Sequence, residues 1–281
     1  MAILTYHALV GRPAELEAWP PGARLYVFTL EEFCRQLDHL AGEGLEAVSM
    51  AHFVRWHQGE AELPPRPVVL AFDDGHRSNA ELALPALQAR GQRAIFFVTA
   101  GRVGREGCVT WDQLGGMLEA GMEVGSHTLT HPQPSRLGRP ALRHELVESK
   151  RVLEDGLGRE VAFVASPTGY DSRRFGALAH EAGYRAALQG VIGRNRRSTD
   201  LFALRRFVLK RSYGFETFRR LVEPRSKAHV PMRVRQAARN VVRHVLGPRG
   251  YEAIRRRLLA EDASSKHQAP GDKQAPSAEG Q

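Results

Sequence analysis

The sequence lacks several features that would assign it to common classes of protein. It has only two cysteines in 281 residues, Cys34 and Cys108, and neither stands in a spacing typical of a metal site or a redox motif. This argues against a disulfide framework and fits a reducing compartment. No run of about 18 uncharged apolar residues occurs, which rules out a conventional membrane span. The first residues show no basic region followed by an apolar stretch, so we expect no signal peptide and a cytoplasmic protein.

Acidic residues are scarce in one region, and the positive charge is concentrated there. Of the formal net charge of +9, most comes from the stretch between Arg225 and Arg257, which has ten Lys or Arg residues and a single acid, Glu252. Residues 232–246 in this stretch have the periodicity of an amphipathic helix, and the following residues are rich in Ala, Ser, Gln, Pro and Gly. We therefore expect a main domain over residues 1–224, a basic helical extension over 225–261 and a disordered tail over 262–281.

The basic extension has three interpretations. One is contact with an anionic membrane surface or a lipid-linked polyanionic substrate, which would place the protein at the inner face of the membrane. The second is nucleic-acid binding, but no recognised motif accompanies the charge, so no specific nucleic acid is expected. The third is a solvated helix that packs on the main domain.

Strand and helix patterns alternate through residues 1–224. Ser or Thr followed three residues later by Glu or Gln predicts helix starts at Thr29, Ser78 and Thr110. The alternation indicates an α/β fold with a mainly parallel sheet, and about seven such units favour a closed or nearly closed (β/α) barrel, whose chemistry lies at the carboxyl ends of the strands. The predicted strands are Ile3–His7, Val68–Asp73, Ala94–Val98, Met122–Gly125, Val161–Val164, Tyr184–Leu188 and Leu204–Leu209.

Two adjacent carboxylates, Asp73 and Asp74, follow an apolar strand and precede Gly75. Successive strand residues point to opposite faces, so the two acids cannot share one role. Acids at a buried strand tip are costly unless a metal or a reaction uses them. His127 and His131 follow a second predicted strand, Met122–Gly125. Asp74 and the two histidines would supply three metal ligands, a number typical of a catalytic site.

Several alternatives to a zinc site remain open. Cobalt, nickel or iron would also suit one carboxylate and two imidazoles. A zinc protease helix needs a glutamate after the first histidine, where Thr128 stands. An iron oxygenase would have the two-histidine, one-carboxylate set with a tight His-x-Asp pair, which is absent. Finally, the histidines could be ordinary loop residues, with the two acids capping a helix.

The motifs Phe72-Asp73-Asp74-Gly75 and Ser126-His127-Thr128-Leu129-Thr130-His131 resemble the signatures of the polysaccharide deacetylases of the NodB-homology superfamily, carbohydrate esterase family 4. The resemblance covers about residues 3–215. It implies a distorted (β/α) barrel that removes N-acetyl or O-acetyl groups from sugars with one bound divalent metal ion. By motif position, Asp74, His127 and His131 would bind the metal, and Asp73 would be the general base.

The third motif of that family corresponds to Ala165-Ser166-Pro167-Thr168-Gly169-Tyr170. The resemblance implies that the amide of Thr168 donates to the oxyanion and that Pro167, Gly169 and Tyr170 lie against the substrate. Tyr170 and Trp111 are candidates for stacking on a sugar ring. The motif lacks its usual first residue, an arginine that holds the base, because Ala165 stands there. Arg206 is a candidate substitute from a later strand, and a surface arginine is the alternative.

The histidine that usually acts as general acid late in the family's sequences is also missing. Leu4-Thr5-Tyr6-His7 instead resembles the deacetylases of poly-N-acetylglucosamine, in which this histidine comes early. The first and last strands of a closed barrel are neighbours, so the permutation is sterically reasonable. His7 would then protonate the leaving amine, and the alternative is a buried histidine satisfied by backbone groups.

These inferences favour a metal-dependent carbohydrate deacetylase, a hydrolase of carbon–nitrogen bonds other than peptide bonds, acting on an N-acetylated sugar or glycan. Two other functions stay open. One is an amidohydrolase of a small non-sugar amide on the same scaffold. The other is a non-catalytic carbohydrate-binding protein that kept the fold.

Overall fold

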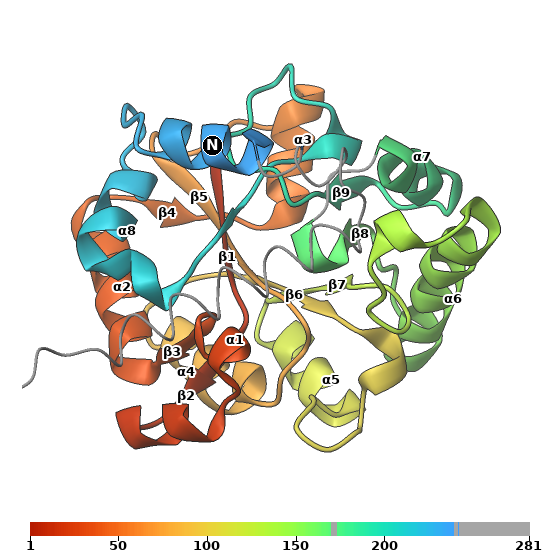
Figure 1. Cartoon of the computed structure of the whole chain (residues 1–281), viewed down its shortest axis with the longest axis horizontal. Coiled ribbons are helices and arrows are strands. Elements are labelled where there is room, and N and C mark those ends of the chain that lie inside the picture. The colour runs from red at the N-terminus through yellow and green to blue at the C-terminus, as the bar shows by residue number, and fades with distance from the viewer. Residues whose placement is uncertain (170–172, 239–240, 242–281) are drawn as a thin grey trace, which may run out of the picture. The chain divides into compact units, whose positions relative to one another are not determined.

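The computed structural model describes residues 1–169, 173–238 and 241 (Figure 1). The chain divides into two units, Met1–Arg233 and Val234–Gln281. Residues 229–238 are helical, whereas most of the basic extension and the whole tail predicted at 262–281 lie outside the described residues. In the described part of the chain, no helix combines the length and the apolar character needed to cross a membrane.

The first unit is built on a parallel sheet in the order β10-β1-β5-β6-β7-β8-β9, with β4 beside β5. All seven strands predicted from the sequence are present: three have the expected length, and four are one to four residues shorter. Parallel pairing throughout the sheet confirms the α/β class. The strands are β1 (Ala2–Tyr6), β4 (Glu46–Ala47), β5 (Pro67–Phe72), β6 (Ile95–Val98), β7 (Glu123–Ser126), β8 (Phe163–Ala165), β9 (Ala186–Leu188) and β10 (Phe207–Val208).

A single segment after β9 joins the two edges of this sheet. Leu204 forms a parallel bridge with Leu188 of β9, and Phe207 of β10 pairs with Leu4 of β1. The same short stretch therefore contacts both edge strands, and the sheet forms the expected distorted (β/α) barrel. Arg206 lies in this seam, between the two contacts.

Helices surround the sheet (Figure 1). Two of the three predicted capping boxes are confirmed, because Thr29 and Thr110 each exchange both hydrogen bonds with the third helical residue. The prediction at Ser78 is wrong: its Oγ accepts the Leu9 N–H at 2.9 Å instead, and a π turn follows. The α-helices are α1 (Pro21–Arg24), α2 (Leu30–Gly42), α3 (Met50–Gln58), α4 (Leu84–Gln88), α5 (Trp111–Glu119), α6 (Arg139–Leu157), α7 (Arg173–Glu181) and α8 (Gly214–Val222). The π turn is η2 (Asn79–Ala83), and the 3₁₀ turns are η1 (Pro13–Ala18), η3 (Ala100–Arg102), η4 (Pro134–Arg136), η5 (Pro167–Gly169), η6 (Leu201–Ala203) and η7 (Arg211–Tyr213).

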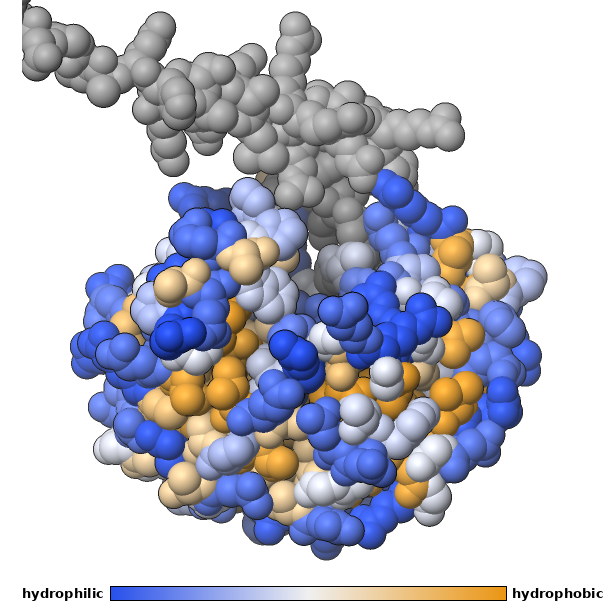
Figure 2. Space-filling view, turned by 90° about the horizontal axis from the view of Figure 1, so that it is seen from below, coloured by the Kyte–Doolittle hydropathy of each residue, from blue (hydrophilic) through white to orange (hydrophobic). Residues whose placement is uncertain are grey.

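The strands are buried on both faces, as expected for parallel strands in a barrel. Alternate residues of β5 enter two separate hydrophobic clusters: Leu70 and Phe72 pack in the larger cluster, which includes residues of α2, α5 and α6, and Val69 and Ala71 pack in the other, which includes residues of α3. This alternation fixes which way the residues at the strand tip point. Figure 2 views the molecule from the side toward which β1 runs, where hydrophilic residues surround separate hydrophobic patches.

A small second sheet lies after β1. It pairs β2 (Ala8–Val10) with β3 (Val27–Thr29) in parallel. The sequence patterns did not predict this second sheet. The segment between these strands contains η1 and α1, and it follows directly on the carboxyl end of β1.

Candidate active site

Asp73 and Arg206 form a buried ion pair at the end of β5. Asp73 continues the alternation of Val69 and Ala71, so its side chain points to the same side of the sheet as theirs. Its side chain is 3% exposed and that of Arg206 is 1% exposed. Nη1 of Arg206 donates to Oδ1 and Oδ2 of Asp73 at 2.8 and 2.6 Å. The guanidinium therefore compensates the charge of this carboxylate and sets its orientation.

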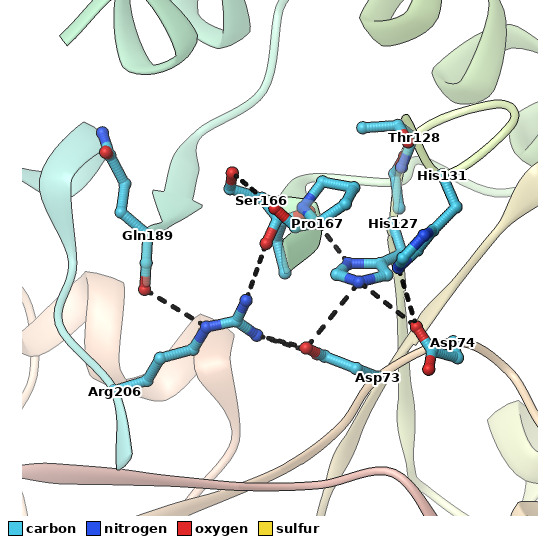
Figure 3. Close-up of polar contacts among 11 residues, drawn as sticks. Asp73, Asp74, His127, Thr128, His131, Ser166, Pro167, Gln189 and Arg206 are labelled. Atoms are coloured by element: carbon cyan, nitrogen blue, oxygen red, sulfur yellow. Dashed lines mark hydrogen bonds and ion pairs between the residues drawn. The ribbon is translucent and has the colours of Figure 1, made fainter. Parts of the chain in front are cut away.

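The remaining donors of Arg206 are satisfied by backbone carbonyls. Nη2 donates to the carbonyl oxygen of Ser166 at 2.8 Å, and Nε donates to that of Gln189 at 3.2 Å (Figure 3). These carbonyls directly follow β8 and β9, so one arginine links the ends of three strands. A surface arginine, the alternative reading of the sequence, would not have this environment.

The chain turns sharply at Asp74. Asp74 and Gly75 both have left-handed backbone conformations, with φ of 74° and 72°. For a non-glycine residue this conformation is strained, and such strain is concentrated at functional sites. Gly75 is required for a second reason, since a Cβ there would lie 2.9 Å from Cγ1 of Val98. The turn points Asp74 away from Arg206 and toward two histidines (Figure 3).

Asp74, His127 and His131 converge, with one ligand atom of each within 4.8 Å of the others. Oδ1 of Asp74 lies 3.4 Å from Nε2 of His127 and 3.1 Å from Nε2 of His131. Ligands at about 2.0–2.2 Å from a tetrahedral ion lie roughly 3.3–3.6 Å from one another. Oδ1 of Asp74 is also buried without a hydrogen-bond partner among the described residues. The spacing and the unpartnered oxygen both fit a bound divalent cation.

The ionisation of Asp74 and His127 also suits a cation. Burial lowers the pKa of His127 to about 4, which leaves its imidazole neutral. Its Nδ1 donates to the Ala165 carbonyl oxygen at 2.9 Å, so the lone pair of Nε2 faces Asp74. Burial alone would raise the pKa of Asp74, but the neighbouring histidines outweigh it and lower this pKa. A carboxylate and a neutral imidazole are the protonation states that metals require.

Glu145 of α6 holds the turn that carries the second histidine. Its carboxylate accepts the N–H groups of Leu129 and Thr130, each at 2.9 Å, and the Thr130 hydroxyl at 2.6 Å. Thr128 and His131 have left-handed φ values of 66° and 64°, so the turn needs such support. Glu145 is a site residue that none of the sequence motifs indicates. Its signal in the sequence is an acid spaced three residues after Leu142 and four before Ser149, on the buried face of α6.

The third motif runs past both Arg206 and His127. Pro167–Gly169 form a short 3₁₀ turn, in which Thr168 has a φ of 61° and is exposed. The carbonyl oxygen of Ala165 accepts from His127, and that of Ser166 accepts from Arg206. Thr168 follows these two residues closely in the sequence. Tyr170 lies outside the described residues.

His7 follows β1 and enters a pocket of about 220 Å³ that Asp74 also lines. Its carbonyl oxygen accepts from Nδ2 of Asn79 at 2.7 Å, and its ring lies 5.0 Å from that of Tyr26. Nδ1 of His7 is buried and has no hydrogen-bond partner in the described structure. His7 is therefore not satisfied by backbone groups at this nitrogen.

The aromatic side chains near the site differ from those expected. Trp111 packs on Gly156 of α6, where its ring leaves no room for a Cβ. Trp19 and Tyr26 line the pocket of His7 instead. Both lie in the segment between β2 and β3, and nothing in the local sequence marks them as neighbours of Asp74.

The sequence of this chain is similar to those of known polysaccharide deacetylases. The family model described as Polysaccharide deacetylase matches residues 60–187. The protein YxkH of Bacillus subtilis (strain 168), named as a polysaccharide deacetylase, is 25% identical over 139 residues, which is 50% of this chain and 50% of that protein. The chain therefore matches only half the length of this curated relative.

Solved structures share the fold. The deacetylase PplD of Streptococcus pyogenes, solved in complex with acetate, has a TM-score of 0.72 at 23% identity and covers 80% of this chain and 98% of its own. IcaB from Ammonifex degensii has a TM-score of 0.67 at 22% identity, covering 79% and 96%. At these identities the likeness concerns the fold, and the chemistry of this chain has to be argued from its own residues.

Proposed function

Because residues 60–187 form a polysaccharide deacetylase domain, we propose that this protein is a divalent-metal-dependent hydrolase that removes acetyl groups from an N-acetylated sugar or polysaccharide. One observation carries the proposal: Asp74, His127 and His131 converge on one point, and Asp73 beside them is held by a buried arginine. Three ligands for a cation and a separate carboxylate are the parts that hydrolysis of an acetamide needs.

The cation would be held by Oδ1 of Asp74 and Nε2 of both histidines, which leaves further positions open. Bound there, it would polarise the acetyl carbonyl and lower the pKa of water. One oxygen and two nitrogen ligands suit Zn²⁺ best, with Co²⁺, Ni²⁺ or Fe²⁺ compatible.

Asp73 is the group best placed to accept a proton from the attacking water. It is adjacent to the triad, with Oδ2 3.7 Å from Nε2 of His127, yet Arg206 holds its carboxylate apart from the ligand set. The two hydrogen bonds from the guanidinium fix the direction of this base before substrate arrives. Arg206 thus takes the positioning role that the sequence of the third motif leaves vacant at Ala165.

Two other groups complete the reaction. The amide of Thr168, in its left-handed turn, would donate to the oxyanion that forms when the acetyl carbonyl is attacked. His7 would transfer a proton to the leaving amine. It follows β1, the first strand of the barrel, and lines the same pocket as Asp74. The amine leaves poorly without that proton, so the reaction needs an acid as well as a base.

An acetate-release assay tests the proposal. Purified protein is incubated with N-acetylglucosamine oligomers after supplementation with Zn²⁺, Co²⁺ or Ni²⁺, and a chelator-treated sample is the control. We expect acetate release that requires the metal. Release from linear acetylated amines but not from any sugar would favour an amidohydrolase of non-sugar amides, and a metal-loaded protein without turnover would favour a binding protein.

A further inference from the structure

One permanently charged side chain lies in the pocket of His7 and Asp74 and has no role in the reaction proposed above. Arg102 lines this pocket, whose volume is about 220 Å³. The residue is exposed, and within the described part of the chain its guanidinium forms no hydrogen bond or ion pair. An arginine side chain carries five N–H donors and stays protonated in proteins, so these donors are available to a ligand.

The backbone of Arg102 is fixed against the histidine turn. Arg102 ends η3, the 3₁₀ turn that comes shortly after β6. In this turn the N–H of Ala100 donates to the Thr128 carbonyl oxygen at 3.0 Å, and the N–H of Gly101 donates to that of Leu129 at 2.8 Å. A Cβ on Gly101 would lie 2.8 Å from the same oxygen of Leu129, so only glycine allows the two turns to approach this closely.

The loop that follows Arg102 returns to the turn of Asp74. The N–H of Val109 donates to the Gly75 carbonyl oxygen at 3.0 Å, and Cys108 lines the pocket. Burial raises the pKa of the Cys108 thiol, the positive charge of Arg102 partly offsets that rise, and the negative charge of Asp74 adds to it. Arg102 and Asp74 therefore both lie near this thiol, and the loop is anchored to both halves of the metal site.

The charges that line the pocket are unbalanced once a cation is bound. Among the described residues of the lining, Asp74 is the only carboxylate. In the proposed function its Oδ1 binds the divalent cation, which leaves no carboxylate of the lining to offset Arg102. A guanidinium and a metal ion repel each other. An anionic group bound in the pocket would offset this repulsion.

We infer that Arg102 binds a negatively charged group of the substrate, which is therefore an acidic N-acetylated sugar that carries a carboxylate or a phosphate. The planar guanidinium matches the paired oxygens of either group, and such bidentate contacts are stronger than those to neutral hydroxyls. The pocket is smaller than the common range of about 300–1,000 Å³. The charged group thus lies on the acetylated sugar unit or is attached directly to it, and this specificity rests on the proposed function.

The test compares the kcat/KM for acetate release from acidic sugars with that from neutral N-acetylglucosamine, with Zn²⁺ present. The acidic substrates are N-acetylglucosamine-1-phosphate, N-acetylglucosamine-6-phosphate and N-acetylmuramic acid, which carries a carboxylate. Arg102→Gln removes the charge, and Arg102→Lys retains it without the planar fork. Arg105→Gln is the matched control, because Arg105 is exposed in the same loop and does not line the pocket.

We expect the wild type to favour at least one acidic sugar over the neutral one by about tenfold or more, the scale of one good charge-assisted contact. Arg102→Gln should bring this ratio close to one, Arg102→Lys should retain part of it, and Arg105→Gln should retain most of it. The acidic sugar that shows the preference identifies the group as a phosphate or a carboxylate. No preference for any acidic sugar in the wild type, or equal ratios in Arg102→Gln and Arg105→Gln, would overturn the inference.

A binding measurement separates this inference from the proposed function. The affinities for the three acidic sugars are measured by NMR titration in the Asp73→Asn background with Zn²⁺ present, where no turnover is expected. Arg102→Gln should weaken the tightest of these affinities about tenfold relative to Arg105→Gln. Any contact of the anion with the metal is common to both variants and cancels in this comparison. If the wild type releases no acetate from any sugar, the proposed function fails, and this arm still decides the role of Arg102: equal affinities in the two variants would refute it.

Discussion

Arg206 donates two hydrogen bonds to the carboxylate of Asp73, although 133 residues separate them in the chain. The contact depends on the closure of the barrel. Arg206 lies between Leu204, which bridges to β9, and Phe207 of β10, which pairs with β1. Asp73 directly follows β5, the neighbour of β1. In the proposed function, Arg206 takes the place of the arginine that the third motif lacks at Ala165.

Replacing Arg206 should damage both stability and activity. Arg206→Met leaves the Asp73 carboxylate buried without its partner, and breaking such a pair costs about 3–5 kcal/mol. We expect a lower free energy of unfolding, measured by urea denaturation, and a large loss of kcat. Arg206→Met combined with Asp73→Asn should be less destabilised than the sum of the two single changes. Additive losses would mean that the two side chains are not coupled.

The two adjacent acids should separate metal binding from turnover. Asp73→Asn should abolish acetate release but keep the bound metal, because the Asp73 carboxylate is hydrogen-bonded to Arg206 and lies farther from Nε2 of His127, at 3.7 Å, than Oδ1 of Asp74 does, at 3.4 Å. Asp74→Asn should lose both, because Oδ1 of Asp74 is the oxygen nearest both Nε2 atoms. Elemental analysis measures the metal content of each variant, and an acetate-release assay measures its turnover. Normal turnover by Asp73→Asn would refute the assignment of the base.

Glu145 should increase the metal affinity of the site although it is not itself a ligand. Glu145→Gln weakens the three hydrogen bonds that hold the Leu129–Thr130 turn, and loss of such supporting contacts typically costs about 10–100-fold in metal affinity. Metal affinity, measured by competition with a chelator, should fall by this factor, while the melting temperature of the metal-free protein should change little. Glu148→Gln, one turn along the same helix and paired with exposed Arg151, is the control and should bind metal normally.

His7 should matter for amides more than for activated esters. An amine needs a proton to leave, and general acid catalysis contributes about 10²–10⁴-fold. A nitrophenolate leaves readily without one. We expect His7→Gln to lose most of its activity on N-acetyl sugars and to retain much of it on nitrophenyl acetate. An equal loss on both substrates would point to a structural role for His7.

Gly125 should tolerate no side chain. A Cβ there would lie 2.6 Å from the Phe97 ring, at the strand that leads to His127. Gly125→Ala should therefore lower stability by about 1–3 kcal/mol, the usual cost of overpacking. Gly115→Ala, in α5 with nothing within 4 Å of its Cβ, is the comparison and should stabilise the helix by up to about 1 kcal/mol. Thermal melts of both proteins measure the difference.

Much of the fold could be predicted because its signals are local. Seven strands followed from short apolar runs, and the helix starts at Thr29 and Thr110 followed from capping residues three positions apart. The failure at Ser78 has a physical cause. Its hydroxyl binds the Leu9 amide, a partner 69 residues away that no local pattern reveals. The short strands β2, β3 and β4 were also missed.

The sequence by itself determined which residues could carry the chemistry: two acids at one strand tip, two histidines at another, and the rhythm that brings strand tips to one end of a barrel. Only the tertiary structure decided how they are held. Arg206 reaches Asp73 through the barrel seam, Glu145 supports the histidine turn from α6, and Trp19 faces the pocket from the segment between β2 and β3. The physical reason is that strand and turn patterns depend on neighbouring residues, whereas a buried charge finds its partner wherever the closed sheet places one.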